Sequence, residues 1–151
     1  MRAILHTALV SAAIALAAGL AWADGHEASH QQLSRHASPE GAVVYIISPK
    51  DGETVSSPVR VLFGLRGMGV APAGVNLPNT GHHHLVVDKE LPDVDAPFPT
   101  TPNNIHFGKG QTETDVALEP GKHTLQLILG DMNHVPHQPP VISQKITVTV
   151  E

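Results

Sequence analysis

The chain has 151 residues, with 9 basic and 14 acidic side chains, and its net charge is −5 with histidine neutral. This acidic balance argues against nucleic acid and against anionic membrane surfaces as partners. The sequence has no cysteine, which excludes disulfides, thiolate metal sites and cysteine nucleophiles.

The first 23 residues have the pattern of a secretory signal peptide. Arg2 gives a positive start, residues 3–20 are rich in alanine and leucine, and Ala21 and Ala23 are the small residues that a signal peptidase reads. We therefore expect cleavage before Asp24, leaving 151 − 23 = 128 residues in the periplasm as a soluble protein. No other apolar stretch is long enough to span a membrane, so no membrane insertion is expected.

Residues 24–41 are polar and have no hydrophobic period, which predicts a flexible tail. If cleavage falls before Asp24, the new N-terminus places His26 third in the chain. An α-amine, two deprotonated amides and this imidazole would form a square-planar set of four nitrogens, the geometry that Cu(II) favours. His26 is therefore a candidate metal ligand, although a histidine can also fall third by chance.

Short strands follow the tail, separated by turns rich in glycine and proline. The predicted strands cover residues 43–48, 59–65, 82–87, 113–118, 124–129 and 141–150. Short strands with turns every 8–12 residues or so, and no helical period, are typical of an Ig-like β-sandwich. The prediction is an all-β protein with one Ig-like, Greek-key sandwich over residues 42–151.

Histidine is the anomaly of the composition, because ten of the 11 histidines follow residue 23. Three of them are consecutive and lead directly into the strand that ends at Val87. Side chains alternate along a strand, so His82 and His84 project on one face and His83 on the other. Two imidazoles at this spacing can hold one metal ion.

In an Ig-like sandwich the start of the third strand, the lead-in to the fourth and the loop between the last two strands all lie at one end. That topology would bring His82 and His84 close to His106, His134 and His137. We call these five residues the histidine pole. We expect them to supply ligands for Cu(II) or Zn(II), both of which suit imidazole.

Other side chains have weaker claims on the predicted site. Met132 is a possible soft ligand, and Asp131 or Asp88 could orient a ligand imidazole through its second nitrogen. His123 follows a Glu-Pro-Gly-Lys turn that resembles the corner where Ig-like domains usually place a tyrosine, so it is assigned a structural role. Each pole histidine could also be structural, by capping a turn or ordering a loop, and His83 could be a satisfied inward-facing residue.

Four long motifs give the chain a resemblance to a bacterial family of secreted domains, the domain-of-unknown-function 4399 family. They are Gly-His-His-His-Leu at residues 81–85, His-Phe-Gly-Lys-Gly-Gln-Thr-Glu at 106–113, Pro-Gly-Lys-His-Thr-Leu-Gln-Leu at 120–127 and Asn-His-Val-Pro-His at 133–137. The resemblance implies one secreted domain and brings no activity or ligand with it.

Three functions are compatible with these patterns. The first is a non-enzymatic periplasmic protein that binds Cu(II) or Zn(II) through the histidine pole. The second is a cell-envelope binding or adhesion module that contacts an envelope protein through the same polar surface, with histidine as a hydrogen-bonding group or pH switch. The third and least favoured is a metal-dependent enzyme, for which Glu113 and Asp115 are the nearest carboxylates.

Overall fold

The computed structural model describes residues 35–151. The predicted signal peptide, His26 and most of the predicted tail lie outside these residues. Among the residues described, no helix is long and apolar enough to cross a membrane.

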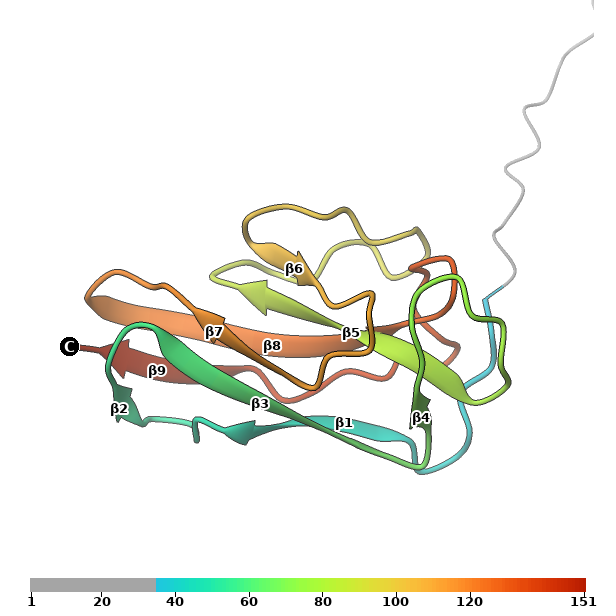
Figure 1. The fold of residues 1–151 in the computed structure, drawn as a ribbon, viewed down its shortest axis with the longest axis horizontal. Helices are drawn as coiled ribbons and strands as arrows, with labels where there is room; N and C mark the ends of the chain where they lie inside the picture. Colours follow the sequence, from blue (N-terminus) through green and yellow to red (C-terminus); the bar gives the residue numbers. More distant parts are fainter. Residues whose placement is uncertain (1–34) are drawn as a thin grey trace, which may run out of the picture. The chain divides into compact units, whose positions relative to one another are not determined.

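Within residues 35–151, nine strands form two sheets (Figure 1). The strands are β1 (Val43–Ser48), β2 (Thr54–Val55), β3 (Val59–Arg66), β4 (Gly69–Val70), β5 (Thr80–Val87), β6 (Asn104–His106), β7 (Glu113–Val116), β8 (Gly121–Gly130) and β9 (Ile146–Val150). One sheet has the order β1-β3-β7, and the other has the order β2-β9-β8-β5-β4, with β6 paired to β5.

The predicted fold class is confirmed. An Ig-like sandwich of seven strands places its first, second, fourth and fifth strands in one sheet and its third, sixth and seventh in the other. Here β1, β3 and β7 form the first sheet, while β5, β8 and β9 are neighbours in the second, all antiparallel. The consequence for the histidines is that β5 lies directly beside β8, so residues that begin β5 meet residues that end β8.

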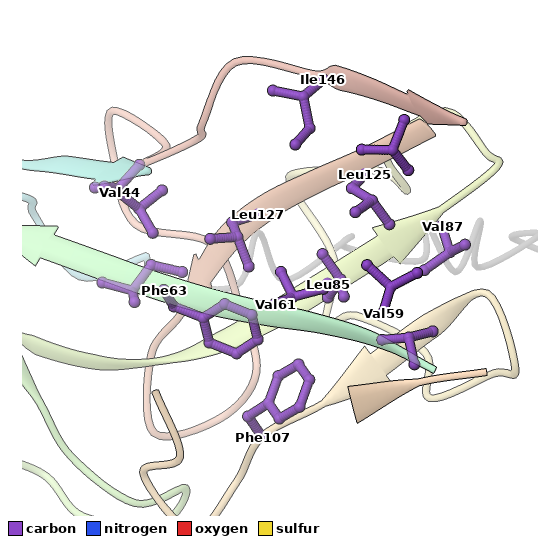
Figure 2. Close-up of a cluster of buried hydrophobic side chains, with 14 of the residues drawn as sticks. Val44, Val59, Val61, Phe63, Leu85, Val87, Phe107, Leu125, Leu127 and Ile146 are labelled. Carbon is purple, nitrogen blue, oxygen red and sulfur yellow. The ribbon is translucent and has the colours of Figure 1, made fainter. Parts of the chain in front are cut away.

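The hydrophobic core fills the space between the two sheets (Figure 2). Alternate residues of each strand point inward, as the period of two requires. Val59, Val61 and Phe63 come from β3, and Leu85 and Val87 come from β5. Leu125 and Leu127 of β8 and Ile146 and Val148 of β9 lie in the same sheet as β5 and, with the β5 residues, face those of β3.

Strand β5 is buried on both faces, which is unusual for a two-layer sandwich. Its inward face carries Leu85 and Val87 into the core, and Val86 on its outer face is also only 2% exposed. The connection that contains the buried Phe98 and the loop after β8 cover this outer face, while β6 pairs with one edge of β5. This cover encloses a compartment over the first half of β5, in which His82 and His84 are fully buried.

The last part of the predicted tail is bonded to the sandwich. Ser38 N–H donates to the Gln138 carbonyl and Gln138 N–H to the His36 carbonyl, while Arg35 donates from Nε to the Pro136 carbonyl. These bonds join residues 35–38 to the loop between β8 and β9 and satisfy backbone groups on both sides.

Candidate metal centre

Four histidine rings meet in the compartment on the outer face of β5. His82 and His84 come from β5, His106 ends β6, and His134 lies in the loop after β8. His82 and His84 are fully buried, whereas His106 and His134 are partly exposed. A solvent path therefore reaches the cluster from the side of His106 and His134.

The ring nitrogens converge on one small volume. One ring nitrogen each from His82, His84 and His106 lies within 4.8 Å of the other two. The Nε2 atoms of His82 and His84 are 3.1 Å apart, and those of His106 and His134 are also 3.1 Å apart. Two nitrogens bound to one tetrahedral metal at about 2.0–2.1 Å lie about 3.3–3.4 Å apart, so both pairs are close to ligand spacing.

Strand pairing explains why three of these rings meet. His82 and His84 share a face of β5 because side chains alternate along a strand. His106 is the direct antiparallel partner of His84 in the pairing of β5 with β6. Residues directly opposite each other on neighbouring strands have Cβ atoms about 4.5–5.5 Å apart, which brings the His106 ring beside the His84 ring.

Two glycines make room for the rings. A Cβ at Gly108 would lie 2.2 Å from Cε1 and 2.5 Å from Nε2 of His106. A Cβ at Gly130 would lie 3.2 Å from Nε2 of His84 and 3.4 Å from the Cα of His134. The His106 ring thus occupies the space that a side chain at position 108 would fill, and Gly130 lets the following loop approach His84.

The loop after β8 holds His134 in a left-handed conformation, with φ of 68°. A non-glycine residue in this region is strained, and such residues cluster at functional sites. Asp131 fixes the turn, since its Oδ1 accepts the N–H groups of Asn133 and Val135 at 2.8 and 3.0 Å. The N–H of Phe98 donates to the His134 carbonyl at 2.9 Å and ties the loop to the cover over β5.

Burial favours the neutral form of three rings, those of His82, His84 and His106. Loss of hydration, and after it the charge of the neighbouring rings, lowers the pKa of His82 to about 4 and that of His84 to about 3. The pKa of His106 is lowered for the same two reasons, burial first and His134 second. A metal ligand must be the neutral imidazole, so these rings are ready to bind a cation at neutral pH.

The second nitrogen of the two buried rings is not used. Nδ1 of His82 and Nδ1 of His84 are buried without a hydrogen-bond partner among residues 35–151. Ligating histidines usually donate this N–H to a carboxylate or a carbonyl. Packing therefore sets the orientation of these rings, and His84 lies against Phe98 with ring centroids 5.3 Å apart.

Neither aspartate named from the sequence orients a ring of the cluster. Asp131 accepts a hydrogen bond from Nδ1 of His36 at 2.7 Å, and Asp88 accepts one from Nδ1 of His123 at 2.7 Å. The reason is position. The Asp131 carboxylate faces residues 35–38 and its own loop, while Asp88 follows β5 at the end remote from His82.

His137 and Met132 lie apart from the four-ring cluster. His137 is buried, donates from Nε2 to the Thr80 carbonyl at 3.1 Å, and has a pKa lowered chiefly by burial. Both residues line a cavity of about 270 Å³ together with His36 and Asp131. The structure thus places His137 and Met132 beside the cluster, in a separate hollow.

His123, which was assigned a structural role, and His83, for which an inward-facing and satisfied position was the alternative, differ in their surroundings. His123 donates from Nε2 to the Glu119 carbonyl at 2.8 Å, as the corner residue of an Ig-like domain does, and its pKa is raised by Asp88 and then by that carbonyl. His83 faces the core against Phe63, with centroids 5.2 Å apart. Both of its ring nitrogens lack a hydrogen-bond partner among the residues described, and burial lowers its pKa to about 4.

The carboxylates considered for catalysis are on the other sheet. Glu113 and Asp115 of β7 pair with Arg60 of β3 at 2.7 and 3.0 Å. Within the described chain, the metal-binding group found is His82, His84 and His106, which contains nitrogen donors only.

Gly108, Gly130 and Phe98 are parts of the site that sequence reasoning missed. The motif His-Phe-Gly-Lys-Gly held a signal for one of them, because a glycine two residues after a candidate ligand lies on the same face of an extended chain. Phe98 gave no such signal, since it stands in a proline-rich stretch without a period.

Comparison with known proteins gives one result. The family model described as Domain of unknown function (DUF4399) matches residues 61–151, a range that includes all four rings of the cluster. The searches of curated proteins and of solved structures found no match.

Proposed function

Because the chain belongs to the family described as Domain of unknown function (DUF4399), whose description assigns no activity, we propose a function from the histidine cluster. The protein binds a transition-metal ion, Cu(II) or Zn(II), in the periplasm. The observation that carries this proposal is the convergence of ring nitrogens from His82, His84 and His106 within 4.8 Å in a largely buried compartment.

The chemistry of the compartment supports a cation. Imidazole nitrogens aimed at one point bring lone pairs together, and burial makes uncompensated polar groups costly, by about 1–3 kcal/mol each. In the metal-free protein one proton can be shared within each of the two Nε2 pairs. Each nitrogen then has a partner only inside its own pair. A bound cation would compensate all of these nitrogens at once, and neutral imidazoles are the ligands that Cu(II) and Zn(II) accept.

Burial favours this function over the envelope-binding module. A recognition surface needs its polar groups in contact with solvent, but His82, His84 and His137 are each 1% exposed or less. Gly108 and Gly130 also leave room for the rings inside the domain. An ion can reach it past His106 and His134, whereas a protein surface would meet only the edges of those two rings.

The location is inferred from the sequence. The predicted signal peptide would export the chain, and in an oxidising compartment imidazole sites have the advantage that they cannot be lost to disulfide formation. The absence of cysteine from the sequence is consistent with that environment.

The test is a titration of Zn(II) and Cu(II) into the protein without residues 1–23 and with His26→Ala, which removes the possible N-terminal copper motif. We expect one tight equivalent. Replacing both His82 and His84 with alanine should abolish it. His83→Leu is the matched control, since it changes the residue between them on the opposite face of β5 and should leave binding intact.

Two results would overturn the proposal. One is binding no tighter than that of an unstructured peptide with a single histidine. The other is a tight equivalent that survives the double substitution. Circular dichroism on each variant would show that the sandwich is retained. Capture of an envelope component that is insensitive to chelator, by a protein that binds no metal, would support the module instead.

A further inference from the structure

We propose that His134 completes a closed, tetrahedral site of four imidazoles, and that the site holds Zn(II) without an open coordination position. This inference rests on the proposed metal binding and deepens it. It follows from the arrangement of the four rings in space, from the backbone of His134, and from the absence of any other donor type in the cluster among the residues described.

The six separations between the four ring centroids describe a tetrahedron. Five of them lie between 4.6 and 5.0 Å, and the sixth, between His84 and His134, is 6.0 Å. A ring centroid lies about 3.2 Å from the metal that its nitrogen binds, so ideal tetrahedral ligation would place all centroids about 5.2 Å apart.

A planar arrangement does not fit these separations. Four imidazoles around a square-planar metal would give four sides of about 4.5 Å and two diagonals of about 6.4 Å. Only the His84–His134 separation approaches a diagonal, because the opposite pair, His82 and His106, is 5.0 Å apart. The four ring centroids therefore form a tetrahedron stretched along the edge between His84 and His134, and a metal bound by all four rings would draw His134 toward the group of His82, His84 and His106.

This shape selects among metals. Zn(II) has no electronic preference for a planar geometry and is tetrahedral in most closed protein sites. Cu(II) prefers square-planar or tetragonal donors, which the strand geometry of His82 and His84 and the position of His106 do not provide. The donors are all imidazole, so the soft sulfur ligands that favour Cu(I) are missing from the cluster.

The loop after β8 is built to present His134 to the other three rings. Its left-handed φ of 68° is maintained by two anchors, the Asp131 carboxylate and the N–H of Phe98. Gly130 allows the close approach, because a side chain there would contact both His84 and His134. His134 is thus held from both sides in a strained conformation, with its Nε2 at ligand spacing from Nε2 of His106. A fourth ligand must be positioned in this way.

A closed site differs in function from an open one. Catalytic zinc usually has three protein ligands and one position for water or substrate, whereas structural and storage sites fill all four. With His134 in place, the ion has no vacant position. Zn(II) is then held rather than used for hydrolysis, and it leaves only when His106 or His134 on the exposed side releases it.

The experiment uses Co(II) as a spectroscopic substitute for Zn(II) in the protein without residues 1–23 and with His26→Ala. Four-coordinate Co(II) absorbs visible light strongly and six-coordinate Co(II) only weakly. We expect the strong spectrum, displaced by one equivalent of Zn(II), and unchanged by azide because no position is open to that anion.

The variant His134→Gly tests the fourth ligand, since glycine tolerates the left-handed backbone that alanine would strain. It should weaken Zn(II) binding at least 10-fold and open one position, so that azide now changes the Co(II) spectrum. His137→Ala, in the neighbouring hollow, is the control and should behave like the parent.

Three results would overturn the closed site while leaving metal binding intact. They are a change of the parent Co(II) spectrum on addition of azide, a six-coordinate spectrum, and a His134→Gly protein that binds Zn(II) as tightly as the parent. A tetragonal paramagnetic resonance spectrum from the Cu(II)-loaded protein would overturn the tetrahedral geometry. Failure of Zn(II), Cu(II) and Co(II) alike to bind would overturn the proposed function itself.

Discussion

Substituting Gly108 with alanine should damage the metal site without touching a ligand. The added Cβ would lie 2.2 Å from Cε1 of His106, whereas ordinary contact begins at 3.4 Å, so the ring must retreat by about 1.2 Å. Gly108 has no positive φ, and alanine therefore fits the backbone. The contact is with the end of a side chain, so the ring can rotate away and the fold should survive.

The expected loss is in affinity for the metal. Displacing a supporting group of a metal site typically costs about 10- to 100-fold in affinity, or about 1.4–2.7 kcal/mol. Isothermal titration with Zn(II) measures this directly. Gly69→Ala is the matched control, because its Cβ would meet only a methyl group of Thr80 at 3.3 Å and its backbone is equally permissive.

A double-mutant cycle identifies the route of the effect. If Gly108→Ala acts by moving the His106 ring, it should have no further effect in a His106→Ala background. Additive losses would mean that position 108 acts elsewhere. An alanine variant that binds Zn(II) as tightly as the parent, while His106→Ala does not, would refute the reasoning from ring space.

Three further outcomes follow from the buried histidines and their loop. His82, His83 and His84 have folded pKa values of about 4, 4 and 3, below the unfolded value near 6.5, so the unfolded state binds more protons as the pH falls below 6.5. In urea unfolding of the metal-free protein, the free energy of unfolding should fall by on the order of 2 kcal/mol per histidine from pH 7 to pH 5 and change little above pH 7. A free energy of unfolding that does not change with pH in this range would contradict the lowered pKa values. His83→Leu should raise the unfolding free energy by about 1–3 kcal/mol and reduce that pH dependence, because it removes two unpartnered nitrogens from the core; a lower midpoint in urea would show that the ring is satisfied. Asp131→Ala should lower the free energy of unfolding by about 1–3 kcal/mol and weaken metal binding. His36→Ala removes only one of the three hydrogen bonds that the Asp131 carboxylate accepts, so it should lower this free energy less. Equal losses in urea unfolding would show that the two bonds to the loop contribute nothing.

The meeting of His82 with His84 was predictable, because it follows from strand alternation alone. The approach of the loop after β8 was also predictable, since an Ig-like order places β8 beside β5. His106 was expected at this end of the sandwich, but its direct pairing with His84 depends on the three-residue strand β6, of which the proline-rich sequence gives no sign. His134 and His137 looked equivalent in sequence. The turn fixed by Asp131 separates them, and one faces the cluster while the other donates to the Thr80 carbonyl.

The room made by glycine was harder to foresee, because the feature is the lack of a side chain and becomes visible only when a neighbour fills the space. The burial of both faces of β5 was hidden for a related reason. Polar histidines on the outer face of a strand indicate contact with solvent. In the structure Phe98 and the surrounding loops cover these histidines and enclose them.

The docking of residues 35–38 on the loop between β8 and β9 has a practical consequence for handling the protein. Any affinity tag fused upstream of Arg35 would join the domain next to the metal centre, where a polyhistidine tag would compete for the ion being measured. The other end of the domain is free of this problem. Val150 pairs with Gly121 at the start of the ten-residue β8, while Gly130 at its end pairs with His82, so about 30 Å of strand separates the C-terminus from the cluster. Figure 1 shows the C-terminus at the end of the domain remote from the start of β5. Immobilisation, fluorophores and purification tags belong after Glu151.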